Sequence, residues 1–265
     1  MYKLIAMDVD DTLLSDKLTV SEETKAALEA AIEQGVTVTL ATGRMYASAV
    51  QIAKQINLNV PIITYQGSLV KTLLEGTVLY ERYVPSQAAI HIQQYCLQHN
   101  LHLQLYVDDL LYGMEENETI KEYSERSKIP YIIEPDFNKL INQPLNKMLI
   151  IDEPAKLDQV SQDLRALVGE EAHITKSKPH FLEITHKEGT KGHALRFMAD
   201  HLGCSMQETI AIGDSWNDHE MIEAAGLGVA MGNATDKLKA IADYVTSSNN
   251  DDGVRHVIEK FVLNQ

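Results

Sequence analysis

The chain has few residues of the kinds that build disulfide-stabilised or membrane-spanning proteins. Its 265 residues include only 2 cysteines, which lie far apart and have no Cys or His neighbours at metal-ligand spacing. Two such cysteines suit a reducing compartment, where each behaves as a small apolar residue. No apolar run approaches the roughly 20 residues that a membrane-spanning helix needs. We therefore expect a cytoplasmic protein with no membrane partner.

Positive charge is also scarce. The sequence has 23 Lys and Arg against 38 Asp and Glu, which gives a formal net charge of −15. A polyanionic surface repels the backbone of DNA and RNA, so we expect no nucleic-acid partner. A small phosphate ester remains compatible with this charge if a metal ion and a few cations reverse the sign inside one pocket.

Both ends of the chain alternate between strand and helix patterns. The first part predicts strands at 3–7, 36–41 and 60–64 and helices at 21–35 and 44–56. The last part predicts helices at 191–202, 218–225, 236–242 and 251–262, with strands at 208–212, 227–231 and 244–246. This rhythm is typical of a Rossmann-like, doubly wound α/β core with a parallel sheet.

The middle of the chain has a different pattern. Two amphipathic stretches, 86–99 and 154–168, lie among short strand-like runs at 101–106, 147–151 and 181–185. This indicates an α+β insert that interrupts one doubly wound domain. We expect a core domain formed by residues 1–82 and 188–265, with an inserted cap domain at 83–187.

Acidic side chains follow two of the predicted strands. Asp8, Asp10 and Asp11 come directly after the first strand, and Asp214 and Asp218 follow the strand at 208–212. In open α/β sheets, ligands bind outside the carboxyl ends of the strands. Carboxylates gathered there are costly unless a cation neutralises them, and hard oxygen ligands favour Mg²⁺. Taken singly, each group could instead cap a helix or face solvent in a turn.

Two further signals concern anions. Thr42, Gly43 and Arg44 follow the second strand and enter a helix, whose N-terminus is a ready anion site. Lys191 stands at the start of a helix, where a cation is unfavourable for the helix dipole unless it faces an anion such as phosphate. In isolation, the first is also compatible with a plain strand-to-helix turn and the second with a solvated lysine.

As a set, these residues resemble the motifs of the haloacid dehalogenase-like phosphatases. The long insert resembles the cap of the Cof-type group, subclass IIB, and so do the runs at 181–185, 228–234 and 242–246. One departure is Asp11, where most members have Gly; we expect its side chain to point away from the metal. The matching motifs in chain order are Asp8-x-Asp10-x-Thr12, Thr42-Gly43-Arg44, Lys191 and Gly213-Asp214-x-x-Asn217-Asp218.

The resemblance implies a mechanism and a role for each residue. Asp8 would be the nucleophile that forms an aspartyl-phosphate, and Asp10 would act first as general acid and then as general base. The Mg²⁺ ligands would be Asp8, the backbone carbonyl of Asp10, Asp214 and, directly or through water, Asp218. The phosphoryl oxygens would be held by Thr42, Gly43, Lys191 and Asn217, while Arg44 steers the phosphate or the leaving group.

The function that the sequence favours is hydrolysis of small phosphorylated metabolites, with sugar phosphates as the leading class. His180 and Phe181 are candidates for lining the pocket from the cap. Alternatives are a phosphomutase or phosphotransferase acting on sugar phosphates, and a non-catalytic sugar-phosphate binder, although the latter predicts loss of a catalytic carboxylate. We expect a monomer or a weak homodimer.

Overall fold

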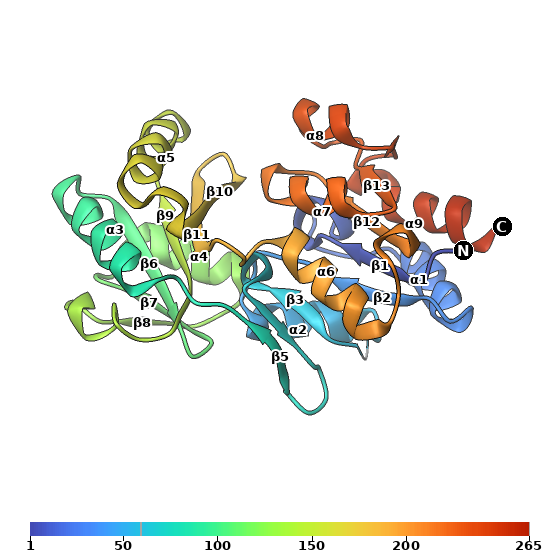
Figure 1. Cartoon of the computed structure of the whole chain (residues 1–265), viewed down its shortest axis with the longest axis horizontal. Coiled ribbons are helices and arrows are strands. Elements are labelled where there is room, and N and C mark those ends of the chain that lie inside the picture. The colour runs from blue at the N-terminus through green and yellow to red at the C-terminus, as the bar shows by residue number, and fades with distance from the viewer. Residues whose placement is uncertain (59, 265) are drawn as a thin grey trace.

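The computed structural model describes residues 1–58 and 60–264 and has two lobes, a core and a cap (Figure 1). A parallel sheet with the strand order β14-β13-β12-β1-β2 forms the centre of the core. Its side chains are apolar on both faces, as expected for parallel strands covered by helices. The strands are β1 (Leu4–Met7), β2 (Thr37–Leu40), β12 (Thr209–Gly213), β13 (Leu227–Ala230) and β14 (Tyr244–Val245).

Helices cover this sheet, with α1 packed against α9 and α6 against α7. The side chain of Ser21 caps α1, and that of Thr190 caps α6, each by accepting a backbone N–H of the first turn. No helix among the described residues is both long and apolar enough to cross a membrane. The core helices are α1 (Glu22–Glu33), α2 (Tyr46–Gln55), α6 (Lys191–Leu202), α7 (His219–Ala224), α8 (Asp236–Ile241) and α9 (Gly253–Ile258).

The order of the strands fixes where a ligand can bind. From β1 the chain moves to β2 on one side, whereas β12, β13 and β14 succeed one another on the other side. The boundary between β1 and β12 is therefore the point at which the strand order reverses, and ligands of open α/β sheets bind at such a point. Both strands end in the same place, because Leu4–Met7 pairs in register with Thr209–Ile212.

A small antiparallel sheet links the core to the cap. It continues the edge of the parallel sheet through a single bridge between Ala41 and Ile63. Its strands are β3 (Ile62–Thr64), β4 (Leu69–Lys71) and β5 (Val78–Glu81).

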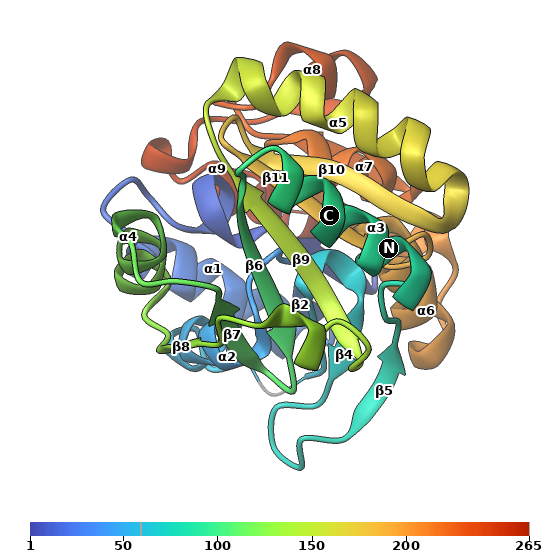
Figure 2. The same ribbon diagram turned by 90° about the vertical axis from the view of Figure 1, so that its left-hand side faces the viewer.

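The cap is a six-stranded sheet with three helices, and every strand pair is antiparallel except β7 with β8. Figure 2 shows α3 and α5 lying on the face of this sheet that points away from the core. In order, the elements are α3 (Ser86–Gln98), β6 (His102–Val107), β7 (Leu110–Gly113), α4 (Glu118–Ser127), β8 (Tyr131–Ile133), β9 (Leu145–Ile151), α5 (Pro154–Val168), β10 (Ala172–Lys178) and β11 (Phe181–His186).

Alternation along the cap strands separates two faces. Met148 and Ile150 of β9 join the apolar cluster beneath α3 and α5, together with Leu182 of β11. The intervening residues point to the other side of the sheet, because successive side chains of a strand alternate. There, Leu149 packs in a second cluster with Tyr65 of the core. The inner face of the cap sheet therefore looks onto the core.

Polar contacts hold the two lobes together. The Lys147 ammonium group donates to the carbonyl of Gly43 at 2.6 Å, and the Tyr65 hydroxyl donates to Asp109 at 2.6 Å. The Ser48 hydroxyl donates to the carbonyl of Ser127 at 2.8 Å. The cap is thus seated on the core directly over the ends of β1 and β12.

Most predicted elements are present, with shifts at their ends. The α/β core and the α+β cap are confirmed. The helix predicted at 251–262 is present as α9, which continues into a π-helical segment at Glu259–Leu263. The sequence analysis missed β4, β5, β7, β8, β10 and α4, most of which are short or strongly polar and lack a clear alternation of apolar residues. The domain limits at 82 and 188 stay a prediction.

Gly67 allows the turn after β3 to approach the start of α6. Its φ is +106°, and an added Cβ would overlap the backbone carbonyl of Thr190. We expect Gly67→Ala to lower the free energy of unfolding by about 3 kcal/mol or more, since backbone strain and a backbone overlap act together. Gly35→Ala is a matched control, because its φ is +84° but nothing lies within 4 Å of the added Cβ.

The control should cost only about 1–2 kcal/mol, the strain of a left-handed residue. Urea unfolding of both variants measures the difference. Equal losses would show that the contact between the turn and α6 does not require a glycine.

Candidate active site at the ends of β1 and β12

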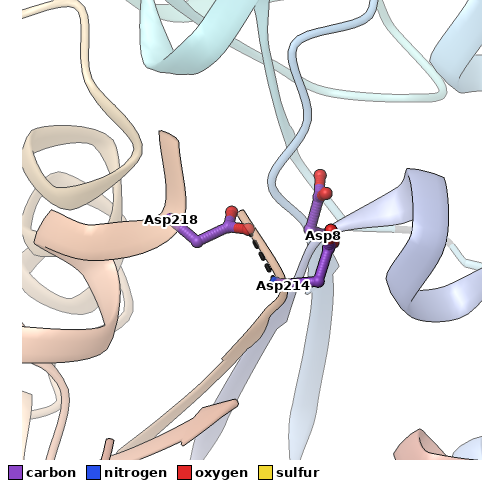
Figure 3. Close-up of side chains that lie close together, drawn as sticks. All are labelled: Asp8, Asp214 and Asp218. Carbon is purple, nitrogen blue, oxygen red and sulfur yellow. Dashed lines mark hydrogen bonds between the residues drawn. The ribbon is translucent and has the colours of Figure 1, made fainter. Parts of the chain in front are cut away.

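Three buried or half-buried carboxylates meet where β1 and β12 end. Asp8 follows β1, Asp214 follows β12, and Asp218 comes from the turn before α7 (Figure 3). One oxygen of each carboxylate can be chosen so that all three lie within 4.8 Å of one another. The sequence predicted this convergence, because the carboxyl ends of neighbouring parallel strands share one edge of the sheet.

Backbone groups fix Asp218 within this cluster. Its Oδ2 accepts hydrogen bonds from the N–H of Asp214 at 2.9 Å and from the N–H of Ser215 at 3.0 Å. Gly213, which precedes Asp214, leaves room for the Asp218 side chain, because an added Cβ at Gly213 would overlap it. The loop thus turns a carboxylate back onto its own backbone, and its other oxygen remains for the site.

Lys191 is the cation of the cluster. Its side chain is fully buried, and the ammonium group donates to Asp8 Oδ1 at 2.6 Å and to Asp218 Oδ1 at 2.7 Å. Burial lowers the pKa of this amine, but the carboxylates of Asp218 and Asp8 outweigh burial and raise it above its ordinary value. Lys191 therefore carries a permanent positive charge at the start of α6.

The remaining negative charge is not balanced by Lys191 alone. Burial raises the pKa of Asp8 to about 7 despite Lys191. Burial and the charges of Asp218 and Asp8 raise the pKa of Asp214 to about 9, against a single hydrogen bond from the Thr12 hydroxyl at 2.7 Å. Carboxylates in such positions stay ionised only if another cation joins them.

A divalent metal ion fits this arrangement. The cluster offers three carboxylates, which are the hard oxygen donors that Mg²⁺ prefers. No Cys lies in it, and the raised pKa values of Asp8 and Asp214 show that the cluster lacks positive charge. The side chain of Asp10 is not part of the cluster, so a role of Asp10 through its backbone carbonyl stays a prediction.

Asp10 instead forms a bidentate pair with Arg44. The guanidinium Nε and Nη2 donate to the two carboxylate oxygens at 2.8 Å each. Burial raises the pKa of Asp10, but the hydrogen bonds and charge of Arg44, with smaller effects of Lys178 and Arg126, lower it below its ordinary value. The role of Arg44 in steering the phosphate or the leaving group stays a prediction; in the structure its side chain pairs with Asp10 and lowers the pKa of that carboxyl group.

The loop after β2 brings Thr42 and Gly43 to the same cleft. The Thr42 hydroxyl accepts the N–H of Arg44 at 3.1 Å, which turns the chain toward α2. Gly43 lies against the amide of Gln66, so that an added Cβ would overlap it. The predicted anion-binding turn therefore borders the carboxylate cluster.

Asn217 and Gln66 form a polar pair beside this turn. The Asn217 Nδ2 donates to Gln66 Oε1 at 2.9 Å. The other amide atoms, Gln66 Nε2 and Asn217 Oδ1, are buried and have no hydrogen-bond partner in the described part of the protein. Buried polar atoms normally have partners, so these two indicate a place for a polar ligand. The sequence analysis missed Gln66, which has the positive φ of 63° typical of a sharp turn.

Comparison with known proteins decides the family. The model of the haloacid dehalogenase-like hydrolases matches residues 5–258. The chain belongs to the haloacid dehalogenase-like hydrolase family. It is 32% identical to a 5-amino-6-(5-phospho-D-ribitylamino)uracil phosphatase of Bacillus subtilis, and the match covers 98% of this chain and 96% of the relative.

Solved structures of the family agree with this membership. A haloacid dehalogenase-like hydrolase from Bacteroides thetaiotaomicron is 30% identical and has a TM-score of 0.87, with 98% of this chain and 99% of that chain covered. The subclass IIB sugar phosphatase BT4131 is 26% identical with a TM-score of 0.88, and 98% of each chain is covered. The resemblance inferred from the motifs is thus confirmed, and the chain is a phosphatase of this family.

The cap adds charged residues that the sequence analysis did not select. Lys147 of β9 is buried and pairs with Glu183 of β11 at 3.0 Å. Charged residues inside otherwise apolar strands were the signal that could have found both, since buried charges are rarely left without a role. Lys178 and Arg126 also line the cleft, but nothing in their local sequence distinguishes them from solvated residues. Phe181 lines the cleft as well.

Asp11 reaches toward the cap and not toward the carboxylate cluster. Its φ of 60° lies in the left-handed region, which explains why a glycine suits this position. Its carboxylate pairs with Lys178 at 2.8 Å.

We predict that removal of Mg²⁺ destabilises this hydrolase more at high pH. The pKa values of Asp8 and Asp214, about 7 and about 9, exceed the roughly 4 of an unfolded chain. Between about pH 4, where the unfolded carboxylates lose their protons, and the higher pKa values of the folded state, the folded protein binds more protons than the unfolded one. The free energy of unfolding therefore falls as the pH rises through this range. A cation that keeps both carboxylates ionised offsets this fall.

The measurement is thermal unfolding with Mg²⁺ or with a chelator, at about pH 5.5 and about pH 8.5. The gain from Mg²⁺ should be larger at the higher pH. It should be lost in Asp214→Asn and kept in Asp236→Asn, which removes an exposed carboxylate. A gain that is independent of pH, or that survives in Asp214→Asn, would contradict the metal assignment.

Proposed function

We propose that the protein is a Mg²⁺-dependent phosphatase that hydrolyses small phosphorylated metabolites, sugar phosphates first among them, through an aspartyl-phosphate on Asp8. One observation carries the proposal: Asp8 is 5% exposed, bonded to a fully buried lysine, and joined by two further carboxylates at the reversal point of the sheet. A buried acid with its own cation and a metal-type donor set is suited to nucleophilic attack on phosphorus.

Attack requires an ionised and oriented Asp8. Lys191 holds Asp8 Oδ1, so the other oxygen is left to attack phosphorus in line with the leaving group. Mg²⁺, held by Asp8, the Asp10 carbonyl, Asp214 and Asp218, would supply positive charge that lets the two anions approach one another. Lys191 adds a fixed charge where negative charge grows on the transferring phosphoryl group.

Candidate hydrogen-bond donors for the phosphoryl oxygens lie at the turn after β2, across the cleft from the carboxylate cluster. The Thr42 hydroxyl and backbone N–H groups of the turn at Gly43 lie at this border. The unpartnered Gln66 Nε2 adjoins them, as does Asn217 Nδ2, which donates one N–H to Gln66 Oε1 and has a second N–H left to donate. We assign these groups to hold the phosphoryl oxygens during transfer, because donors that are already fixed in place cost no reorganisation.

Asp10 serves the proton transfers. It gives a proton to the leaving oxygen while Asp8 forms a bond to phosphorus. It then takes a proton from water, whose oxygen attacks phosphorus, breaks the bond to Asp8 and releases inorganic phosphate. Because Arg44 lowers the pKa of Asp10, the ionised form dominates at neutral pH, which favours the second step.

The cap restricts the substrate. The cavity between Asp8 and the cap has a volume of about 60 Å³, whereas ligand pockets usually measure roughly 300–1,000 Å³. The cap must therefore move to admit the ester and release the product. The similarity to the sugar phosphatase BT4131 supports sugar phosphates, and the similarity to the 5-amino-6-(5-phospho-D-ribitylamino)uracil phosphatase of B. subtilis supports a phosphorylated ribityl compound as a second candidate.

The proposed location is the cytoplasm. Cys96 and Cys204 are free and buried, which suits a reducing compartment. A monomer or weak homodimer acting on a small metabolite remains the proposed state.

Asp8→Asn should abolish turnover. We expect a loss on the order of 1,000-fold or more in kcat for p-nitrophenyl phosphate with Mg²⁺, because the amide cannot attack phosphorus. Asp16→Asn, which changes an acid of the same loop outside the cleft, should keep wild-type kcat. Retained activity in Asp8→Asn with normal circular dichroism would contradict the covalent scheme.

Arg44→Ala should shift the pH profile. Without the guanidinium group the pKa of Asp10 rises, so the acidic limb of kcat, on which the base must be ionised, should move to higher pH. Arg44→Lys keeps a charge and should shift the limb less. An unmoved limb in Arg44→Ala would show that Asp10 is not the base.

A further inference from the structure

Three cations of the cap line the cleft above Asp8, and they differ in how fully they are paired. Lys147 is buried, pairs with Glu183 at 3.0 Å and donates to the Gly43 carbonyl at 2.6 Å, so it is fully engaged within the protein. Lys178 has one partner, Asp11. Arg126 forms no hydrogen bond or ion pair with any residue that the structure describes.

The pair between Lys178 and Asp11 is easily exchanged. The Asp11 side chain is 43% exposed and that of Lys178 is 14% exposed, so water reaches the pair from the Asp11 side, and ion pairs open to water contribute roughly 0–1 kcal/mol. The pair joins the lobes, because Asp11 belongs to the loop after β1 and Lys178 ends β10 of the cap. An anion that enters the cleft can therefore replace Asp11 at Lys178 at little cost.

The backbone conformation of Asp11 directs its side chain toward Lys178. Its φ of 60° is unfavourable for a residue with a side chain. Its carbonyl accepts a hydrogen bond from the Asn233 amide at 2.7 Å, which fixes the turn. Asp11, whose backbone conformation is unfavourable, thus places its carboxylate as the counter-ion of Lys178.

Arg126 lies between the cleft at Asp8 and an outer pocket. Together with Tyr123 and Phe181 it lines both the cleft at Asp8 and an adjoining outer pocket of about 110 Å³. The rings of Tyr123 and Phe181 pack edge to face at 5.7 Å and form an apolar wall beside the guanidinium group. Arg126 is exposed, so its guanidinium group is open to an anion that enters the cleft. Its planar fork of N–H donors matches the two oxygens of a carboxylate or phosphate.

We propose that Lys178 and Arg126 form a subsite for a second acidic group, a carboxylate or a second phosphate, on the leaving group of the substrate. Asp11 occupies Lys178 when that group is absent. The inference rests on the proposed function, since it names the class of ester that the same site hydrolyses. The phosphate that is cleaved does not need these two cations, because Lys191 and the loop at Thr42 already serve it.

The test uses pairs of esters that differ in one acidic group. We compare kcat/KM with Mg²⁺ for glucose 6-phosphate against 6-phosphogluconate and for fructose 6-phosphate against fructose 1,6-bisphosphate. The wild type should prefer the more acidic member of at least one pair by about ten-fold. The pair that shows the preference tells a carboxylate from a second phosphate.

Lys178→Ala and Arg126→Ala should each reduce that ratio by about five-fold or more. Lys176→Ala is the matched control, since Lys176 lies on the same strand but its ammonium group contacts Asp158 and the Pro154 carbonyl on α5. Hydrolysis of the esters without any preference for the acidic member, or a preference that both variants retain, would overturn the subsite and leave the phosphatase standing. No hydrolysis of any ester would instead count against the proposed function.

Binding gives a readout that does not depend on turnover. In the Asp8→Asn background, calorimetry should show tighter binding of the acidic ester than of its neutral partner. Adding Asp11→Asn should lower the Kd of the acidic ester by about three- to ten-fold, because Lys178 loses its resident competitor. A raised or unchanged Kd would show that Asp11 does not compete for this lysine.

Discussion

The ammonium group of Lys191, buried between Asp8 and Asp218, is the interaction on which the site depends. Three carboxylates at the end of a buried sheet repel one another and lose their hydration. The Lys191 ammonium group is hydrogen-bonded to two of them, and its displacement would leave the buried charges of Asp8 and Asp218 without a cation. The start of α6, where Lys191 lies, must therefore be positioned next to the end of β1. The cap at Thr190 and the close approach of the turn at Gly67 fix it there.

The raised pKa values of Asp8 and Asp214 show that this lysine is insufficient. The same lack of positive charge that weakens the folded state makes the site receptive to a divalent metal ion. Stability and function thus draw on one arrangement, as is common where groups with shifted pKa values cluster. Arg44 separates Asp10 from the cluster by giving it a cation of its own, so that neighbouring acids take different roles.

The cap contributes a second layer of charge. Its inner face places the pair of Lys147 and Glu183 beside the turn at Gly43, and Lys178 and Arg126 line the same cleft. The first pair is buried, and its Lys147 also bonds to the Gly43 carbonyl of the core, whereas Lys178 has a single partner in Asp11 and Arg126 has none among the described residues. Family members share the catalytic fold but carry different substrate names, which is consistent with selection by the cap and not by the core.

The sequence by itself determined the core fold, the strand ends that carry Asp8 and Asp214, and the family. These follow from local signals, since apolar runs, turn residues and motif spacing are encoded within short stretches of chain. It did not reveal the pairings of Arg44 with Asp10, of Lys147 with Glu183 or of Lys178 with Asp11. Only the tertiary structure decided these, because each partner lies on a different element, and the pair of Lys178 with Asp11 also depends on how the cap is seated on the core.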